Sequence, residues 1–352
     1  MISIIICSRT KDLPQALHQN IAETIGCEYE LVIIDNSHND FDIFSAYNHG
    51  VERAKGDILC FMHDDIYFHT QQWGIAVEEK FNENANLGLI GIIGGHVQPL
   101  ATDWRVDSKY ASIHYLQRAE TLEISPRHNT HTCYHICKNS IPYGKDGTLV
   151  KVATVDGVWF CIPRYLFKDI RFDDKTFEGF HIYDLDISMQ VLQAGKDAAV
   201  CNNIEIEHFS GGLFTHEFMK SMQQFNEKYQ SVLPAIEGIK ISEQEKAKIR
   251  TYTSTERLQK RIERDELRKR IIAKQYAIRK GQTGISLTEE EDLEGRKTVF
   301  RYMRYVMKVK KNYSFLIALK SLIEYISDKR NPYRYKLVTK FVYYRLIEIW
   351  RI

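Results

Sequence analysis

The chain has 352 residues, of which 44% are hydrophobic and 12% aromatic, and its formal net charge at pH 7 is +2. This composition supplies enough apolar surface for a packed core and excludes a largely disordered protein. The near-neutral total conceals an asymmetry: residues 297–352 contain 14 Lys and Arg against 3 Asp and Glu, a net charge of +11, and the preceding residues carry −9. This pattern predicts an acidic body followed by a basic region with a separate purpose.

The seven cysteines are scattered through the chain, and several lie in apolar runs where a free thiol behaves as a small hydrophobic side chain. An odd number at irregular spacing favours a reducing compartment over a disulfide framework. The apolar run Ile2–Cys7 is shorter than the core of a signal peptide and is followed by Arg9 and Lys11. No uninterrupted apolar segment is long enough to span a bilayer, so we expect a cytoplasmic protein.

Strands and helices are predicted to alternate over the first 65 residues. Runs typical of strands buried in a parallel sheet occur at 1–7, 30–34 and 58–62, the first of them largely β-branched, and a further strand is expected at 87–93. Pro14 suits the first turn of a helix that reaches about Ile25, and a second helix is expected at Phe44–Lys55 with Gly56 as its C-cap. This order predicts right-handed crossovers and an α/β fold with a mostly parallel sheet.

The strand at 58–62 ends abruptly on His63-Asp64-Asp65. Adjacent carboxylates just beyond a strand repel one another unless a cation lies beside them. Because open α/β sheets bind ligands at the carboxyl ends of their strands, this pattern predicts a divalent metal and a phosphorylated ligand. An exposed acidic turn that merely closes the strand is the alternative interpretation of these residues alone.

Five stretches resemble, in their order and spacing, the nucleotide-sugar transferases of glycosyltransferase family 2: SIIICSR, LVIIDNS, AYNHGVERAKGDILCFMHDD, DGVWFCIPRYLF and FEGFHIYDLDISMQVLQAG. The resemblance covers roughly residues 1–212. It implies the GT-A fold, a Rossmann-like α/β architecture with flanking helices, and a nucleoside diphosphate sugar as donor. We therefore expect a glycosyltransferase domain at 1–240, followed by a helical, basic region at 241–352.

The resemblance also implies roles for single residues. Asp65 falls on the family's metal ligand, here for Mn²⁺ or Mg²⁺, and Asp64 on the position that faces the ribose. Further donor-binding residues implied at the ends of the first two strands are Ser8, Arg9, Asp35 and Asn36. His208, which follows a strand-like segment, matches a late histidine that touches the metal or diphosphate in many relatives; a structural histidine is the alternative. His63 departs from the family, which has Asp at that position.

The segment Phe177–Gly195 predicts a glycine-bounded loop and then a helix that ends at its last glycine. Asp184 and Asp186 stand near the start of this helix, where acidic side chains interact favourably with the helix dipole, and capping is the alternative interpretation for one of them. The resemblance implies that Asp184 is the general base that deprotonates the acceptor hydroxyl. Tyr183 stands where the family has the Glu of a Glu-Asp pair.

Residues 99–147 lack clear periodicity, and we interpret them as an insertion over the face that carries the active site. Within them, histidine and cysteine alternate at positions 131, 133, 135 and 137. On a strand these four side chains would share one face. A zinc site is one interpretation, but the spacing differs from the usual zinc motifs, and a strand face lined by these residues is favoured.

The chain beyond about residue 241 changes character. Residues 242–280 are densely charged, with apolar positions at helical spacing, and residues 298–352 combine aromatic and aliphatic residues with the basic ones. Basic amphipathic helices suit an anionic membrane surface, which predicts peripheral attachment to the inner face of a membrane. A helical bundle packed on the preceding domain is the alternative, and no nucleic-acid-binding motif accompanies the charge.

Together these observations predict a metal-dependent, inverting glycosyltransferase that moves a sugar from a nucleoside diphosphate sugar to a hydroxyl of a glycan or lipid-linked acceptor. A nucleotidyltransferase of the same fold would need a glycine-rich basic loop after the first strand, and residues 8–11 contain no glycine. A non-catalytic scaffold that binds a nucleotide sugar or a partner is the alternative from a different class, and an activity assay separates the two.

Overall fold

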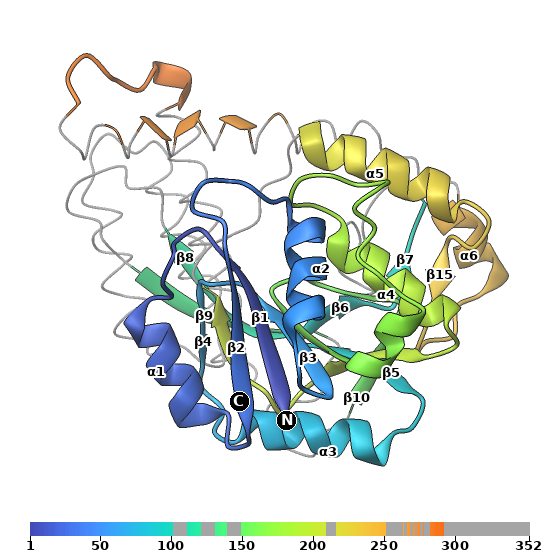
Figure 1. Cartoon of the computed structure of the whole chain (residues 1–352). Helices are drawn as coiled ribbons and strands as arrows, with labels where there is room; N and C mark the ends of the chain where they lie inside the picture. Colours follow the sequence, from blue (N-terminus) through green and yellow to red (C-terminus); the bar gives the residue numbers. More distant parts are fainter. Residues whose placement is uncertain are drawn as a thin grey trace, which may run out of the picture. The chain divides into compact units, whose positions relative to one another are not determined.

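The computed structural model describes residues 1–100, 111–120, 131–138, 149–208, 216–250 and 282–291, with single positions between 263 and 277 (Figure 1). The chain divides into two compact units. The first comprises residues 1–116, 136–208 and 216–258, and the second comprises residues 117–135, 209–215 and 259–352. The strands that follow belong mainly to the first unit.

A seven-stranded sheet in the order β10-β13-β5-β12-β3-β1-β2 forms the centre of the first unit. Its strands are β1 (Ile2–Ser8), β2 (Tyr29–Asp35), β3 (Ile58–Met62), β5 (Leu87–Gly91), β10 (Leu149–Val152), β12 (Trp159–Pro163) and β13 (Asp197–Cys201). β1 pairs in parallel with β2 and β3, and β5 pairs in parallel with β13. β12 runs antiparallel between β3 and β5, and β10 runs antiparallel to β13. Five of the seven strands therefore share one direction, which confirms the predicted α/β fold with a mostly parallel sheet.

The helices are α1 (Gln15–Thr24), α2 (Ile43–Arg53), α3 (Trp73–Glu83), α4 (Tyr183–Gln193), α5 (His216–Tyr229) and α6 (Glu243–Arg250), with a 3₁₀ helix at Arg164–Lys168. The predicted C-cap at Gly56 is wrong, because α2 ends at Arg53 and its C-cap is Ala54, whose backbone is extended (φ −68°, ψ 141°). Gly56 serves close packing instead: a Cβ there would lie 2.7 Å from the carbonyl oxygen of Met1 and the amide nitrogen of Ser3.

The core of the first unit forms on both faces of the central strands. Every residue of β3 is buried, as is almost all of β1, which explains why their sequences are unbroken apolar runs. Aromatic rings of α2, the sheet and the loop before α4 pack against one another, with ring centroids 5.0 Å apart between Tyr47 and Phe61 and between Phe61 and Phe172. Each large side chain buried in this way contributes about 1.5–3 kcal/mol to stability.

A second sheet has the order β11-β6-β8-β14-β4, with β9 paired to β8. Its strands are β4 (Ile66–Phe68), β6 (Ile93–Gly95), β8 (Ala111–Glu120), β9 (His131–Lys138), β11 (Thr154–Val155) and β14 (Ile206–His208). A short two-stranded sheet joins β7 (Val97–Gln98) to β15 (Ala235–Ile236). The pairing of β14 with β4 sets His208 opposite Ile66, beside the loop that follows β3. The strand predicted at 131–137 is confirmed as β9, whose side chains lie outside the described residues.

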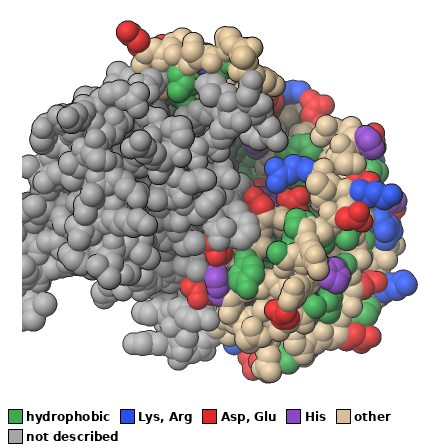
Figure 2. Space-filling view, turned by 90° about the vertical axis from the view of Figure 1, so that its left-hand side faces the viewer, with side chains coloured by type: hydrophobic (Ala, Val, Ile, Leu, Met, Phe, Trp, Pro, Cys, Tyr) green, Lys and Arg blue, Asp and Glu red, His purple; other side chains and the backbone are tan. Residues whose placement is uncertain are grey.

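The predicted boundary near residue 240 and the position of the 99–147 insertion stay predictions, and residues 298–352 lie outside the described part of the chain. In the second unit, Thr288 and Glu291 cap each other: the Thr288 N–H donates to Glu291 Oε2 at 2.8 Å, and the Glu291 N–H donates to Thr288 Oγ1 at 3.2 Å. No helix among the described residues is both long and apolar enough to cross a membrane. Acidic and basic side chains are interspersed over the described surface seen in Figure 2, so this face has no single sign of charge.

Candidate active site and metal centre

The ends of β1 and β3 bring three of the predicted donor-binding residues together. The parallel register pairs Ile5 with Phe61, so the residues that follow each strand meet at the same edge of the sheet. The Ser8 hydroxyl and the Arg9 backbone N–H both donate to Asp64 Oδ2 at 3.3 Å, and Arg9 Nη2 donates to Asp64 Oδ1 at 3.1 Å. Asp64 is thereby oriented before any ligand binds.

Asp35 and Asn36 follow β2, and the pairing of β1 with β2 sets Asp35 opposite Ser8. Asp35 is exposed, and the hydroxyl and backbone N–H of Ser37 lower the pKa of its carboxyl. Asn36 is buried, and its side-chain amide bonds both ways with Phe41: Nδ2 donates to the Phe41 carbonyl at 2.9 Å, and Oδ1 accepts from the Phe41 N–H at 2.9 Å. The amide of Asn36 therefore supports the loop, and its role in donor binding stays a prediction.

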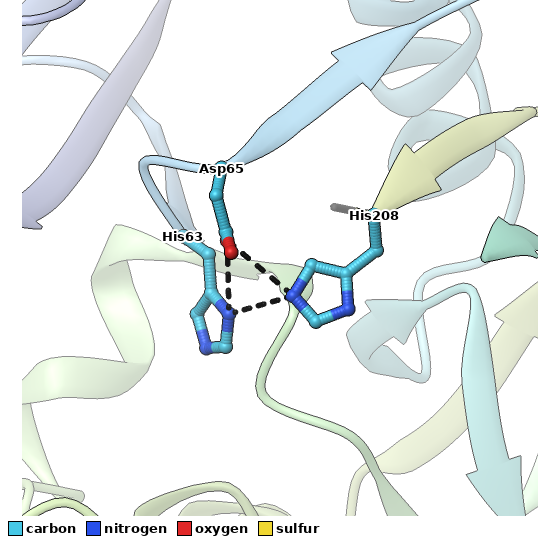
Figure 3. A group of neighbouring side chains, drawn as sticks. All are labelled: His63, Asp65 and His208. Carbon is cyan, nitrogen blue, oxygen red and sulfur yellow. Dashed lines mark hydrogen bonds and ion pairs between the residues drawn. The ribbon is translucent and has the colours of Figure 1, made fainter. Parts of the chain in front are cut away.

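His63, Asp65 and His208 form a cluster of potential metal ligands, the His–Asp–His cluster, in which one donor atom of each residue lies within 4.8 Å of the others (Figure 3). His63 Nδ1 lies 3.3 Å from His208 Nε2, and Asp65 Oδ1 lies 3.7 Å from the first and 3.4 Å from the second. His63 and Asp65 come from the loop between β3 and β4, whereas His208 ends β14. The predicted ligands Asp65 and His208 are thus neighbours in space.

The geometry and chemistry of this cluster fit a divalent transition-metal ion. Two ligand atoms that are each about 2.1 Å from one metal stand about 3.0–3.4 Å apart, close to the separations found here. Imidazole nitrogens are typical ligands of transition metals, whereas Mg²⁺ takes oxygen ligands. Desolvation, followed by the nearby His208, lowers the pKa of His63, which favours the neutral imidazole that a metal requires.

Asp184 is held at the start of α4 by two backbone N–H groups. Gly157 N–H donates to Oδ2 and Leu185 N–H donates to Oδ1, each at 2.9 Å, and only 6% of the residue is exposed. The second bond satisfies a free N–H of the first helical turn, whereas the N-cap residue, Ile182, makes no side-chain capping bond. Ile182, immediately before the helix, has φ +72°, a strained conformation for a β-branched residue that costs about 1–3 kcal/mol. The strain indicates that packing imposes the position of this turn.

The model of the glycosyltransferase-like family matches residues 3–234. The chain belongs to this family. The curated streptomycin biosynthesis protein StrF of Streptomyces griseus is 26% identical over 178 residues, a match that covers 49% of this chain and 55% of StrF. The chain thus spans about half the length of this relative.

The chain is also similar to two solved structures. GalNAc-T7 with UDP, GalNAc and Mn²⁺ is 11% identical, with a TM-score of 0.41 over 70% of this chain and 53% of GalNAc-T7. Residues 1–349 of TarS from S. aureus are 11% identical, with a TM-score of 0.36 over 97% of this chain and 88% of the TarS chain.

Within this glycosyltransferase-like chain, the structure brings most of the predicted site residues close together, and it adds one residue to the candidate metal site that the sequence did not predict. Ser8, Arg9 and Asp64 are in contact, Asp65 and His208 belong to the His–Asp–His cluster, and Asp35 lies beside the first of these groups. The missed residue is His63, which the resemblance marked only as a departure from the family motif. Its position directly after a buried strand and before two carboxylates was the available signal.

Proposed function

We propose that this protein is a metal-dependent glycosyltransferase that uses a nucleoside diphosphate sugar as donor. The observation that carries this proposal is the adjacency of two groups at one strand end. Asp64, bound by Ser8 and Arg9, directly precedes Asp65 of the His–Asp–His cluster. A ligand that binds both groups needs a polar sugar or base to contact Asp64 and an adjacent anion to contact a metal in the His–Asp–His cluster. A nucleoside diphosphate has both parts, since its nucleoside is joined directly to the diphosphate.

The donor is expected to lie across the carboxyl ends of β1, β2 and β3. Asp35 and Asp64 offer carboxylate oxygens to nucleoside hydroxyl or N–H groups. The guanidinium of Arg9 has most of its surface exposed, with 76% of the side chain accessible, so it can turn toward a phosphate. A divalent ion held by His63, Asp65 and His208 would supply positive charge beside the diphosphate leaving group.

Asp184 is the proposed general base. The acceptor oxygen forms a bond to the anomeric carbon as the bond from that carbon to the diphosphate oxygen breaks, and the hydroxyl proton passes to the Asp184 carboxylate. Attack on the face opposite the leaving group inverts the configuration. The N–H groups of Gly157 and Leu185 orient this carboxylate before the reaction, so solvent does not have to reorganise around it when the proton is transferred. The acceptor is proposed to be a glycan or lipid-linked hydroxyl.

Thermal melts with nucleoside diphosphates and Mn²⁺, together with donor turnover, test the proposal. We expect nucleotide and metal together to raise the melting temperature of the wild type, because a ligand at 100 times its Kd adds about 2.7 kcal/mol. Asp65→Ala should abolish this shift and the turnover. Asp169→Ala is the matched control, because this exposed aspartate ends the 3₁₀ helix that follows β12, and β12 itself ends beside the start of β3, at the edge of the sheet opposite the candidate site. An unchanged shift in Asp65→Ala, or no metal-dependent binding of any nucleotide by the wild type, would contradict the proposal.

A further inference from the structure

We propose that Tyr183 is a positioning residue that fixes the tautomer of His63, so that Nε2 carries the proton and Nδ1 presents its lone pair to the metal site. This inference rests on the proposed function, because it assigns a role toward the metal that the His–Asp–His cluster would hold. It also gives a role to the residue at which the chain departs from the Glu-Asp pair of the family that it resembles.

The Tyr183 hydroxyl contacts both the backbone of Gly157 and the imidazole of His63. It donates to the Gly157 carbonyl oxygen at 3.2 Å, and it lies 3.0 Å from His63 Nε2. A carbonyl oxygen can only accept a hydrogen bond, and a tyrosine has a single hydroxyl proton. When that proton is directed at Gly157, the contact with His63 is a hydrogen bond only if Nε2–H of the imidazole donates to the tyrosine oxygen.

The other nitrogen of His63 faces the cluster. Nδ1 lies 3.3 Å from His208 Nε2 and 3.7 Å from Asp65 Oδ1 (Figure 3). With the proton on Nε2, the lone pair of Nδ1 points to the place where the other two ligand atoms converge. Metal-ligating histidines commonly donate their second ring N–H to an outer partner, which fixes both tautomer and ring orientation. Tyr183 occupies the position of that partner.

The opposite tautomer loses the hydrogen bond between Tyr183 and Gly157 at one end of His63, and at the other end it cannot bind a metal. If Tyr183 donated to Nε2, its oxygen and the Gly157 carbonyl oxygen would face each other at 3.2 Å without a proton between them. At the other end, Nδ1 would carry a hydrogen directed at the cluster, and a protonated nitrogen cannot ligate a metal. One arrangement of protons therefore satisfies both contacts of the hydroxyl and leaves the metal site open.

The surroundings of Tyr183 give the hydroxyl little freedom to move. The residue is buried, and its ring meets the rings of Phe44 and Tyr47 edge-on, with centroids 6.4 and 5.6 Å away. A Cβ on Gly157 would overlap the hydroxyl, so the close approach requires glycine at that position. The N–H of the same glycine donates to Asp184, so the backbone of one residue orients both the proposed base and the residue behind a proposed metal ligand.

The decisive experiment determines the tautomer of His63 in the metal-free, full-length protein from the ring nitrogen shifts of histidine-labelled samples, assigned with a His63→Asn variant. We expect the Nε2–H form in the wild type and a mixture of tautomers in Tyr183→Phe, which keeps the ring and removes the hydroxyl. Tyr47→Phe is the matched control, since it removes a hydroxyl from the neighbouring ring and should leave His63 unchanged. A wild-type His63 protonated on Nδ1, or a tautomer unaffected in Tyr183→Phe, overturns the inference.

Mn²⁺ titration, followed by the electron paramagnetic resonance signal of the free ion, gives a second readout. Tyr183→Phe should raise the Mn²⁺ Kd by about 10–100-fold, and Tyr47→Phe should not change it. If Tyr183→Phe does not fold, His63→Asn and His63→Gln show which nitrogen of His63 binds the metal. The amide of asparagine reaches the position of Nδ1, and the amide of glutamine reaches the position of Nε2. If His63→Asn loses less Mn²⁺ affinity than His63→Gln, Nδ1 is supported as the ligand atom. If His63→Gln loses less affinity than His63→Asn, the inference is overturned. A wild type that binds no Mn²⁺ contradicts the proposed function, while the tautomer measurement still judges the role of Tyr183.

Discussion

Lys228 on α5 reaches the buried face of α4, where its ammonium lies 2.6 Å from Oδ1 of Asp186, a carboxylate with no exposed surface. The Tyr229 hydroxyl donates to the same oxygen at 2.8 Å, and Lys228 also pairs with Asp173 at 2.7 Å. The second acidic residue of α4 is thus part of an internal ion-pair network, whereas the first accepts the backbone bonds at the proposed active site. This network joins α4 to α5 through charge that is largely withdrawn from water.

Lys228→Met should destabilise the protein by about 3 kcal/mol at pH 7. This value is at the lower end of the range for removing one partner of a buried ion pair, because 26% of the lysine side chain is exposed. Burial raises the pKa of Asp186 and the Lys228 ammonium opposes that rise, so removing the ammonium favours protonation of Asp186. As pH falls, Asp186 becomes protonated and no longer carries an unpaired buried charge. The loss of stability in Lys228→Met should therefore be smaller at lower pH. Denaturant melts at several pH values measure both effects.

Lys220→Met is the matched control for that change. Lys220 pairs with Glu178 on the surface, where the two side chains are 64% and 73% exposed, and its loss should alter stability by less than about 1 kcal/mol. Adding Asp186→Asn to Lys228→Met should restore part of the lost stability, because it removes the uncompensated charge. Equal costs for the two lysine substitutions would show that the buried pair is not important for stability.

Asp173 should contribute to acid sensitivity between pH about 4 and about 2. Partial burial raises the pKa of this carboxyl, but the hydrogen bonds from Lys228 and Thr176 outweigh it and lower the pKa to about 2. A carboxyl with a lower pKa in the folded state stabilises that state above its unfolded pKa and loses the contribution as pH falls through the folded value. Melting temperatures of Asp173→Asn should therefore fall less than those of the wild type over this window, with Asp169→Asn as control. Parallel curves for wild type and Asp173→Asn would contradict this prediction.

Asp184→Asn should lower the turnover rate by about 10²–10⁴ while the affinity for nucleotide changes little. The variant should also be less stable than the wild type by about 1–3 kcal/mol, because the amide NH₂ of asparagine must face the N–H of either Gly157 or Leu185, and two donors cannot bond to each other. Turnover should be measured well below the melting temperature, and nucleotide affinity by calorimetry on the same sample. A collapse of nucleotide affinity together with turnover would place Asp184 in the donor site instead.

Gly157→Ala should lower stability by about 1–3 kcal/mol, because the added methyl overlaps the buried ring and hydroxyl of Tyr183. The substitution should also disturb the contact between Tyr183 and His63, and so weaken Mn²⁺ binding. In a Tyr183→Leu background the same change should cost less, since the atoms that the methyl meets are gone. Additive stability losses in the double variant would show that the two residues are not coupled.

Deletion of 298–352 should abolish co-sedimentation of the protein with anionic vesicles. The segment carries a net charge of +10 together with apolar and aromatic residues at helical spacing, the two requirements for binding at a membrane interface. Charge alone acts over about 8 Å at physiological salt, so binding should weaken at high salt but persist through the apolar face. Neutral vesicles are the control. An intact chain that ignores anionic vesicles, with a truncated chain that aggregates, would instead show that the segment is part of the fold.

The sequence alone was sufficient for the features that depend on local chemistry. The unbroken apolar runs predicted β1, β2 and β3, and the carboxylates that end two of them marked the edge of the sheet where the candidate site lies. The glycine at 195 ends α4 with a φ of +74°, as its position suggested. Such signals are readable because strand periodicity, buried apolar runs and helix ends are properties of neighbouring residues.

Only the tertiary structure decided which distant residues meet. β12 runs antiparallel between β3 and β5, and the register of β14 on β4 brings His208 to His63 across 145 positions of the chain. Likewise, the amide of Asn36 bonds to the backbone of its own loop, and Gly56 packs against the start of β1 instead of ending a helix. Register and close packing depend on the shapes of surfaces that are far apart in sequence, so no local pattern records them.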